Sequence, residues 1–430
     1  MPVAEVIENI LGPDVPIRVV AYDGSTAGPD EPVATLVVRS PDAIARVLTR
    51  PGELGLSRAY VAGNLDIEGD VFAVFDLDRS AERPALTPRA LADLLRAAGP
   101  SVLRVLPPPQ EEARLHGAVH SRRRDRQSIS HHYDVSNDFY ASVLGPSMTY
   151  SCAVFASPEV DLAAAQAAKH ELVCAKLGLG PGMRLLDVGC GWGSMAIHAA
   201  RHHGVRVVGV TLSEAQHEWA TKQVVDTGLG DLVEIRLQDY REVADGPFDA
   251  ISSIGMFEHV GRRRMAEYFS RLHALLRPGG RLLNHAIGRP GRETGDTVGA
   301  QVSATAHRLG VAAGLRGPSR ISSPFMDRYV FPDGELHEVG TVVSMMQDTG
   351  FEVRHLESLR EHYGLTLRRW VANLEANWET ALGEVGAARA RIWRLYMAGS
   401  AVGFERHRLE VHQVLGLRPG GSGFPLRPSF

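Results

Sequence analysis

The stretch Arg184-Leu185-Leu186-Asp187-Val188-Gly189-Cys190-Gly191-Trp192-Gly193 decides the fold. Its first five residues are mainly apolar, as in a buried strand, and three glycines at alternate positions follow them. A glycine turn between a strand and a helix lets a ligand approach the backbone closely, because no Cβ atoms obstruct it. The stretch therefore predicts the first strand, turn and helix of a ligand-binding α/β sheet.

Strand-like and helix-like segments alternate after this stretch. Four more apolar or alternating runs predict strands at 205–210, 232–237, 248–253 and 281–287. Helical patterns at 194–203 and 213–227 separate the first three strands. In the second helix, Ser213 and Gln216 match the S-x-x-Q capping box, in which each side chain bonds the backbone N–H of the other residue. This alternation is typical of βαβ units and predicts an α/β fold with a mostly parallel sheet.

The rest of the chain is divided by composition. Residues 1–80 contain short strand-like runs, at 17–22 and 34–38 among others, and predict a small N-terminal α+β accessory domain. Residues 81–126 combine a helical pattern, three consecutive prolines and the basic cluster at 122–126, so we expect a helix and linker. The sheet would occupy 127–430. Within it we expect a helical insertion at about 289–320, helices through 365–404 and a last strand near 409–415.

The composition excludes several classes of protein. The 430 residues carry 46 Lys+Arg and 50 Asp+Glu, and this net charge of −4 argues against a dedicated nucleic-acid binder. No apolar run approaches the ~20 residues needed to span a bilayer, so any membrane role would be peripheral. The first residues contain no basic region before an apolar core, and we expect no signal peptide. Three widely spaced cysteines fit neither a disulfide framework nor a C-x-x-C metal site, which predicts a reducing, cytoplasmic setting without a metal centre.

The ligand of the glycine turn remains open from the turn alone. Such turns bind dinucleotides, flavins or S-adenosylmethionine, and some have a purely structural role. Two details disfavour a dinucleotide. The pattern is G-x-G-x-G rather than G-x-G-x-x-G, and Thr211-Leu212-Ser213 stands where an acidic residue would end the second strand.

Nine motifs in a fixed order extend this pattern over about residue 128 to the C-terminus. They are HYD (132–134), MTYSCA (148–153), VGCGWG (188–193), GVTLS (209–213), QDYR (238–241), GMFEHVG (255–261), HAIG (285–288), YVFPDG (329–334) and HYGLTL (362–367). Together they resemble the cyclopropane-fatty-acid synthase family. The resemblance implies a class I methyltransferase fold, which is Rossmann-like with a mostly parallel seven-stranded sheet, and an S-adenosyl-L-methionine-dependent C-methyltransferase.

The resemblance also implies which residues bind and react. Carried over position by position, the cofactor site would comprise Tyr133, Tyr150, Ser151, Gly189, Gly191, Thr211, Leu212, Gln216, Asp239 and Tyr240. The family holds a bicarbonate ion beside the reacting carbons. Here it would be held by the side chains of Glu258, His285 and Tyr363 and by the backbone of Cys152 and Ile287.

These residue types suit methyl transfer to an alkene. The attack leaves positive charge on a carbon atom, which the negative faces of aromatic rings stabilise while the rings exclude water. Tyr133, Tyr150, Phe257 and Tyr363 are the candidate rings. Closing a ring then requires a base placed against carbon. A carboxylate acceptor, a switchable imidazole donor and a phenol donor can hold such a base.

Structural alternatives stand beside these roles. Glu258 could serve only as an acidic residue in a first helical turn, and His285 as a hydrogen-bonded core histidine. Tyr363 could simply pack its ring, and the Gln216 side chain could serve only the capping box. For Cys152 we expect a buried residue that contributes its backbone rather than a catalytic thiol.

The resemblance implies unsaturated phospholipid acyl chains as the substrate and a cyclopropane ring as the product. It further implies a cytoplasmic protein that contacts the inner face of the membrane, and it leaves a homodimer open. One alternative product is a methylene- or methyl-branched chain formed from the same carbocation. Two alternatives of other classes are a non-catalytic lipid- or cofactor-binding subunit and a nicotinamide-dependent oxidoreductase.

Overall fold

A computed structural model describes residues 1–12, 15–76, 88–113, 124, 136–291, 323–421, 424–428 and 430. The chain divides into two compact units. Unit 1 contains Met1–Arg114, Ser323–Pro332 and Trp370–Val402, and unit 2 contains Leu115–Ser322, Asp333–Arg369 and Gly403–Phe430. The domain boundaries at 80 and 126 stay a prediction. Most of the expected insertion at 289–320 falls on residues 292–322, which lie outside the described residues.

Unit 1 is built on a four-stranded sheet. Its strands are ordered β2 (Thr26–Ala27), β1 (Ile17–Ala21), β3 (Ala34–Val38) and β4 (Leu65–Gly69), with β1 and β3 parallel and the other pairs antiparallel. The helices of this part of the chain are α1 (Val3–Leu11), α2 (Pro41–Thr49), α3 (Glu53–Val61), α4 (Ala73–Asp76), α5 (Pro88–Ala98) and the short η2 (Pro100–Leu103). The strands expected at 17–22 and 34–38 are confirmed.

Late segments of the chain are bound to the sheet within unit 1. The helices α14 (Arg360–Ala376) and α15 (Trp378–Glu405) each run from one unit into the other. In unit 1, the buried guanidinium of Arg394 donates to the carbonyl oxygens of Ile67 (2.7 Å) and Gly69 (3.0 Å) in β4. The short helix η6 (Met326–Val330) is held by Glu112, whose carboxylate accepts from the Tyr329 hydroxyl at 3.2 Å.

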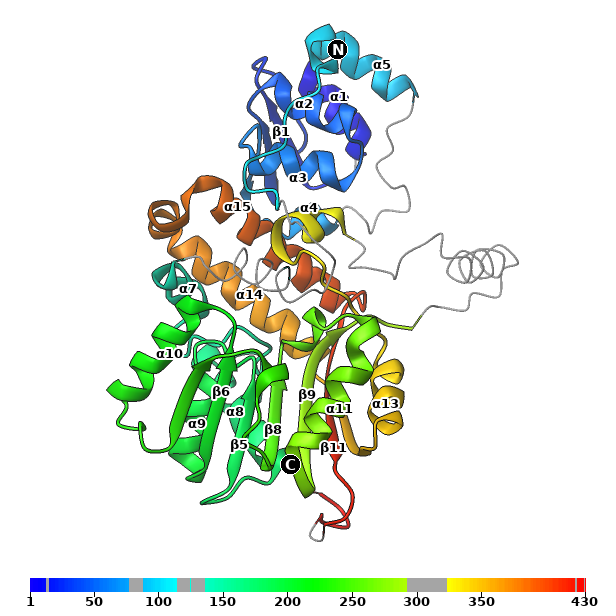
Figure 1. Ribbon diagram of the computed structural model, residues 1–430. Helices are drawn as coiled ribbons and strands as arrows, with labels where there is room; N and C mark the ends of the chain where they lie inside the picture. Colours follow the sequence, from blue (N-terminus) through cyan, green and yellow to red (C-terminus); the bar gives the residue numbers. More distant parts are fainter. Residues whose placement is uncertain are drawn as a thin grey trace, which may run out of the picture. The chain divides into compact units, whose positions relative to one another are not determined.

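Unit 2 contains a seven-stranded sheet in the order β10-β11-β9-β8-β5-β6-β7 (Figure 1). Its strands are β5 (Arg184–Val188), β6 (Arg206–Thr211), β7 (Val233–Leu237), β8 (Phe248–Ile254), β9 (Leu276–Gly288), β10 (Glu352–Ser358) and β11 (Glu410–Leu417). The neighbours from β9 to β7 are parallel, and only β11 runs antiparallel to its two neighbours. The predicted α/β fold with a mostly parallel seven-stranded sheet is confirmed.

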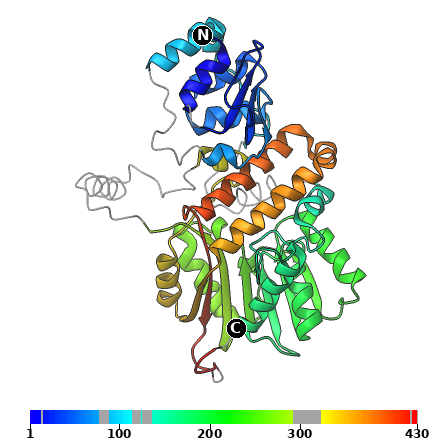
Figure 2. The ribbon, with the colours of Figure 1, turned by 180° about the vertical axis from the view of Figure 1, so that it is seen from behind.

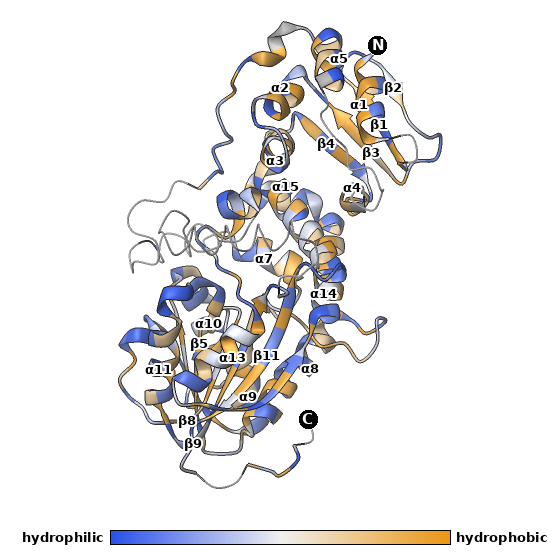
Figure 3. Ribbon diagram, turned by 90° about the vertical axis from the view of Figure 1, so that its right-hand side faces the viewer, coloured by the Kyte–Doolittle hydropathy of each residue, from blue (hydrophilic) through white to orange (hydrophobic). Residues whose placement is uncertain are grey.

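Helices cover both faces of this sheet (Figure 2). On one face, α8 (Leu162–Leu177), α9 (Ser194–His203) and α10 (Glu214–Asp226) pack on strand residues such as Leu185 and Leu283. On the other face, α11 (Met265–Leu275) and α13 (Val339–Asp348) pack on residues such as Leu186 and Leu282. Neighbouring strand residues point to opposite faces of the sheet. Because helices cover both faces, the strands are apolar on both sides. In Figure 3 the hydrophobic colours run along the strands, and α10 carries mostly hydrophilic ones.

The five expected strands of the C-terminal part and its last strand are confirmed within two residues at most ends, although β9 begins five residues early. The helices expected at 365–404 correspond to α14 and α15. Strand β10 was not predicted. It is an edge strand with charged or polar residues at most positions and none fully buried, so it lacks the apolar signal of its neighbours. Among the described residues, no helix is long and apolar enough to cross a bilayer.

Candidate functional site

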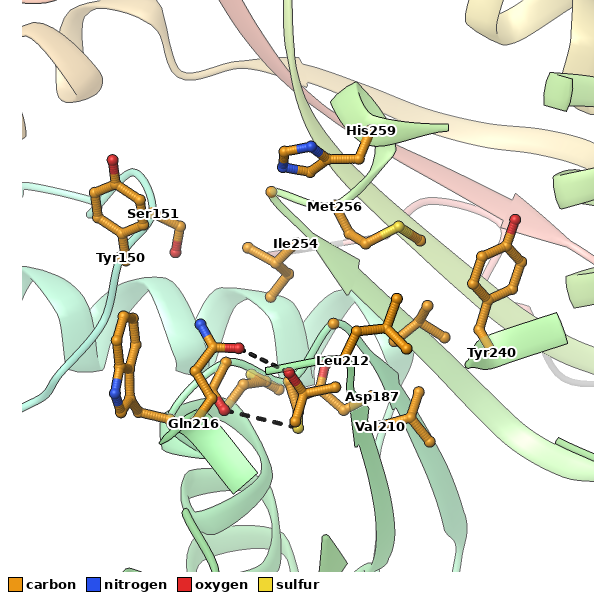
Figure 4. A pocket seen from close by; sticks show the side chains of 18 of the residues that line it. Tyr150, Ser151, Asp187, Val210, Leu212, Gln216, Tyr240, Ile254, Met256 and His259 are labelled. Carbon is orange, nitrogen blue, oxygen red and sulfur yellow. Dashed lines mark hydrogen bonds between the residues drawn. The ribbon is translucent and has the colours of Figure 1, made fainter. Parts of the chain in front are cut away.

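A pocket lies in unit 2 where four parallel strands end. The residues that follow β5, β6, β7 and β8 line it, together with the loop at 148–151 and part of α8. It encloses about 1160 Å³ of empty space, its open mouth included. Figure 4 shows Tyr150 and Ser151 on one side of the pocket, Met256 and His259 on another, and Tyr240 across from Tyr150. Open α/β sheets bind ligands at this edge.

The glycine turn forms the floor of the pocket. The backbone N–H groups of Gly189 and Cys190 both donate to the carbonyl oxygen of Val210, at 2.9 and 3.0 Å. Gly189 and Gly191 have φ angles of 75° and 56°, which favour glycine. A Cβ atom at Gly189 would lie 2.9 Å from Cγ of Met256, whereas one at Gly191 would meet no atom within 4 Å. The space above Gly191 is therefore open to a ligand, as the sequence predicted.

The end of β6 presents a hydroxyl and an amide to the pocket. The Ser213 hydroxyl accepts from the backbone N–H of Gln216 at 3.2 Å, so one half of the predicted capping box is confirmed. The other half is wrong. The Gln216 side chain does not return to Ser213; its Oε1 accepts from the Thr211 hydroxyl at 2.7 Å. The Ser213 backbone N–H donates instead to the Thr211 hydroxyl at 3.3 Å, and Figure 4 shows the Gln216 side chain directed at the pocket.

The residues after β7 add one neutralised carboxylate. Both oxygens of Asp239 accept from Arg241, at 2.8 Å from Nε to Oδ1 and 2.6 Å from Nη2 to Oδ2. Asp239 Oδ1 also accepts from the Arg241 backbone N–H and so begins the short helix η3 (Tyr240–Glu242). This ion pair holds the Tyr240 ring at the pocket wall without leaving a net charge there.

Helix α8 positions the loop that carries Tyr150 and Ser151. The Gln166 side-chain amide donates to the Ser151 carbonyl at 2.9 Å, and the Lys169 ammonium donates to the Ser151 hydroxyl at 2.9 Å. On the other side of this loop, the Tyr140 ring lies 6.0 Å from the Tyr150 ring. The loop is thus fixed on both sides.

Aromatic rings form one wall of the pocket. The Trp192 ring lines the pocket, and the Tyr140 ring lies behind it, 4.4 Å away between centroids. Trp192 donates from its indole nitrogen to the side-chain oxygen of Asn137 at 2.9 Å, in the helix α7 (Asn137–Leu144). The predicted ring of Phe257 does not line the pocket. It packs instead in the core beside Tyr268 and Phe269.

Lys169 is the main residue that sequence reasoning missed. Its side chain is almost fully buried, and burial lowers the pKa of its ammonium group to about 7. It interacts electrostatically with Asp187 and Cys152, and its charge acts on His285. It thereby links the pocket to the predicted catalytic residues. A signal was present in the sequence, because this arginine-rich chain has only three lysines and two of them, Lys169 and Lys176, lie seven residues apart on one helix.

Asp187 is a second buried carboxylate of the pocket, and unlike Asp239 it forms no ion pair with a neighbouring arginine in the described part of the chain. Its Oδ1 accepts from the Ser252 hydroxyl at 2.7 Å, and its Oδ2 is buried with no hydrogen-bond partner among the residues that the structure describes. Burial raises the pKa of Asp187 to about 6. Asp187 and Lys169 are thus an acid and a base whose pKa values converge near neutral pH, because each loses hydration when it is charged.

Nine of the ten predicted cofactor residues line the pocket together. They are Tyr150, Ser151, Gly189, Gly191, Thr211, Leu212, Gln216, Asp239 and Tyr240. Tyr133 lies outside the described residues. The residues present fit a nucleoside with a small charged side arm. They offer an open glycine backbone, aromatic and aliphatic walls, and hydroxyl, amide and carboxyl groups within one pocket.

Glu258 and Ile287 are brought together beside the pocket. Glu258 is buried in the short helix η4 (Phe257–His259), and its Oε1 accepts from the Ile287 backbone N–H at 2.6 Å. Burial raises the pKa of Glu258 to about 7, and this hydrogen bond opposes the shift. The other oxygen, Oε2, is buried with no partner among the described residues.

His285 lies two residues before Ile287 in β9, next to Ile254 of β8. Lys176 donates to Oε1 of Gln413 at 2.7 Å, which directs the Gln413 amide nitrogen to Nδ1 of His285 at 3.1 Å. Burial and the charge of Lys169 hold the pKa of His285 well below its usual range. The imidazole is therefore neutral with its proton on Nε2, and it acts as a fixed donor rather than the switchable one expected. Its Nε2 is buried with no partner among the described residues.

Cys152 and Tyr363 meet at the start of α14. Both the Cys152 thiol (3.6 Å) and the Tyr363 backbone N–H (3.1 Å) donate to the Leu359 carbonyl oxygen. The Cys152 side chain is fully buried, and burial raises the pKa of its thiol, so the expectation of an unreactive thiol is supported. The Tyr363 ring packs on Phe404 at 4.6 Å. Among the described residues of unit 2, no hydrogen bond joins the Cys152 thiol or the Tyr363 backbone N–H to Glu258 or His285.

The chain is similar to several known proteins. Residues 120–414 match the family model of mycolic acid cyclopropane synthetase. A probable fatty acid methyltransferase of Mycobacterium tuberculosis is 44% identical over 427 residues, which cover 96% of this chain and 94% of the relative. The cyclopropane-fatty-acyl-phospholipid synthase of Escherichia coli K12 is 32% identical over 89% of this chain and 87% of its own length.

One solved structure is similar in fold and sequence. It is the crystal structure of the mycolic acid cyclopropane synthase CmaA1 complexed with SAH and CTAB, with 33% identity and a TM-score of 0.59. The match covers 68% of this chain and 98% of the CmaA1 chain. The predicted class I methyltransferase fold is thereby confirmed.

Proposed function

The chain belongs to the mycolic acid cyclopropane synthetase family of S-adenosylmethionine-dependent methyltransferases, and we propose that it forms cyclopropane rings at cis double bonds of unsaturated phospholipid acyl chains. One observation carries this proposal. Glu258 Oε2 and His285 Nε2, two buried polar atoms with no hydrogen-bond partner in the described part of the chain, lie on the segments that end beside the glycine pocket. A buried polar atom costs free energy unless it is bonded, so these atoms indicate a bound polar group.

The glycine pocket would hold the cofactor. S-adenosylmethionine supplies a methyl group on a positively charged sulfur when it is bound. The open backbone at Gly191 admits its close approach, and the hydroxyl and amide of Thr211 and Gln216 offer a donor and an acceptor to a ribose. Tyr150 and Trp192 exclude water from the same space. Water would otherwise capture the substrate carbocation as an alcohol.

Glu258 and His285 would hold the base. Bicarbonate supplies a base that can act on a carbon-bound proton without forming a bond to carbon. The neutral His285 donates from Nε2, and Glu258 accepts at Oε2. The Ile287 N–H is already bonded to Glu258, so Ile287 would act by fixing that carboxyl group. Tyr363 and Cys152 stay proposed members of this set.

The alternative product also has support. The relative with 44% identity is named a probable fatty acid methyltransferase, which is compatible with a methyl- or methylene-branched chain from the same carbocation. The acyl substrate itself is supported by the phospholipid in the name of the Escherichia coli relative and by the long-chain CTAB in the CmaA1 complex. Peripheral contact with the inner face of the membrane follows from this substrate, and a homodimer stays a prediction.

Product analysis tests the proposal. The full chain would be incubated with S-adenosylmethionine, bicarbonate and vesicles of cis-monounsaturated phospholipid, and the released acyl chains analysed by mass spectrometry before and after mild hydrogenation. We expect chains that gain one methylene unit and resist hydrogenation. Chains that gain this unit but take up hydrogen would identify the branched methylene product. Unchanged chains, with binding of S-adenosylmethionine intact, would identify the non-catalytic binding protein and overturn the proposal.

A further inference from the structure

A cluster of potential metal ligands lies between α8 and α9, on side chains that the proposed reaction does not use. Helix α8 contributes Glu171 and Cys174, one turn apart, and α9 contributes His198 and His203. One ligand atom from each of Cys174, His198 and His203 lies within 4.8 Å of the other two.

Glu171 adds a fourth donor to this cluster. Its Oε2 lies 3.3 Å from Nε2 of His198 and 3.1 Å from Nε2 of His203. Two ligands that bind one zinc ion tetrahedrally at about 2.0–2.1 Å are about 3.3 Å apart. The carboxylate oxygen therefore lies at this spacing from each of the two nitrogens. The Cys174 sulfur and one nitrogen of each imidazole lie within 4.8 Å of one another.

The chemistry of the four groups suits Zn²⁺. A thiolate, two imidazoles and a carboxylate form a typical ligand set for this borderline-soft ion, and their two negative charges balance its charge. Cys174 is buried and forms no disulfide, so its sulfur is a free thiol that can bind a metal ion. The carboxylate end of the cluster is the accessible one, since the Glu171 side chain is 56% exposed against 14% for His198. An ion can thus enter from solvent.

We propose that Glu171, Cys174, His198 and His203 form a structural zinc site that clamps α8 to α9. Binding would replace the thiol proton of Cys174 by the metal and release that proton. The proposal departs from the expectation of no metal centre, which rested on the absence of a C-x-x-C motif. These ligands come from two helices separated by β5, so no short spacing marks them. The clamp would stiffen the pocket, because α8 also carries Lys169 and α9 directly follows the glycine turn.

Metal titration of the full chain tests the site. The purified protein would be stripped with a chelator under reducing conditions and titrated with Co²⁺ as a visible probe, and then the Co²⁺ would be displaced with Zn²⁺. We expect one Co²⁺ per chain with the intense visible absorption of tetrahedral coordination and a near-ultraviolet thiolate band. We also expect Zn²⁺ to raise the melting temperature.

Variants assign the ligands. Cys174→Ser should remove the thiolate band and weaken Co²⁺ binding at least about 100-fold, and His203→Ala should weaken it similarly. Glu171→Gln, at an exposed position that tolerates substitution, should weaken it by about 10- to 100-fold. The matched control is His202→Ala, on the same helix but outside the ligand set, which should bind as the wild type does. Circular dichroism confirms that each variant is folded. Co²⁺ binding that is absent, or unchanged in Cys174→Ser and Glu171→Gln, would overturn the proposal and leave a hydrogen-bonded cluster.

Discussion

At the scale of single residues, burial changes the acid–base character of the groups that matter most. Lys169, Asp187 and Glu258 are all buried, and their pKa values lie at about 7, 6 and 7. Each value is moved toward neutral by the loss of hydration, which always disfavours the charged form. Such convergence is common at functional sites. Here, pKa values near neutral mean that Lys169, Asp187 and Glu258 are each only partly charged at neutral pH. They lie next to the position where a substrate cation would form.

Lys169 should be needed for cofactor binding. Replacing Lys169 by Met removes the donor to the Ser151 hydroxyl and leaves Asp187 buried without its cation. A lost hydrogen bond to a charged group costs about 1.5–3 kcal/mol, so the affinity for S-adenosylhomocysteine should fall by about 10- to 100-fold. Calorimetric titration measures this, with Lys222→Met as the control because Lys222 is an exposed lysine.

The pH profile of binding separates a functional role of Lys169 from a structural one. In the wild type, the affinity for S-adenosylhomocysteine should change with pH near 7, where Lys169 titrates, and Lys169→Met should lack this change. Unchanged affinity and an unchanged pH profile in the variant would remove Lys169 from the site.

Glu258 should make the stability of the protein depend on pH. Its pKa is raised from 4.5 to about 7 on folding, so between these values the unfolded state binds fewer protons than the folded state. The free energy of unfolding therefore falls as the pH rises through this window, by up to ~3 kcal/mol. Urea unfolding at about pH 5 and about pH 8 should show this loss in the wild type and a smaller one in Glu258→Gln. Glu214→Gln, at an exposed site, should behave as the wild type. Equal pH dependence in all three proteins would show that Glu258 is ionised in the folded state.

At the scale of elements, the glycine turn combines a backbone requirement with an open surface. Gly191 and Gly182 both have positive φ angles, 56° and 79°, and neither would place a Cβ atom within 4 Å of another atom. Only Gly191 faces the pocket. The two positions therefore share the same conformational cost of substitution and differ in their access to a ligand.

Gly191→Ala should weaken cofactor binding where Gly182→Ala does not. Both variants should lose about 1–2 kcal/mol of stability from the left-handed backbone. Gly191→Ala should in addition reduce the affinity for S-adenosylhomocysteine by about 10-fold or more, because its methyl group occupies the space of the ligand. Melting temperatures and calorimetric titration of the two variants test this pair. The same affinity in both would mean that no ligand approaches Gly191.

Elements with a strong local signal could be predicted from the sequence, and others could not. The strand Arg184–Val188 and the helices around it follow from apolar periodicity and glycine spacing. Strand β10 could not be predicted because it is an exposed edge strand with mostly polar residues, which gives no apolar pattern. The S-x-x-Q spacing predicts a capping-box role for the Gln216 side chain, because local spacing does not reveal its bond to the Thr211 hydroxyl of the preceding strand. The role of Lys169 could not be predicted from local spacing either, since its partners Ser151 and Asp187 are distant in the sequence.

At the scale of the whole molecule, each unit combines segments that are distant in the chain. Unit 1 joins the N-terminal sheet to residues of α15 through Arg394, which donates to β4, and through the ion pair of Arg391 with Asp66. The sequence could suggest a small α+β region but not this return of the chain, because a buried arginine in a helix carries no sign of its partners. Unit 2 was predicted more fully because nine motifs fall within it or at its edges.

Arg394 should hold the sheet of unit 1 together with the helix that carries it. Arg394→Met leaves the carbonyl oxygens of Ile67 and Gly69 without this donor and should cost about 3 kcal/mol, as for other broken buried polar pairs. Hydrogen exchange followed by mass spectrometry should show faster exchange across Leu65–Gly69. Arg96→Met, at an exposed arginine of the same unit, should leave this exchange unchanged. Equal protection in both variants would show that Arg394 is not needed, and that other contacts such as the Arg391–Asp66 ion pair hold the helix to the sheet.

The most direct test of the central claim separates cofactor binding from chemistry at Glu258. Glu258→Gln keeps the size of the side chain and an oxygen that can accept from Ile287, but it cannot carry the charge that ionised Glu258 can. We predict an affinity for S-adenosylhomocysteine within about twofold of the wild type and a loss of lipid product by at least about 100-fold. Product formed by Glu258→Gln at the wild-type rate would contradict the account.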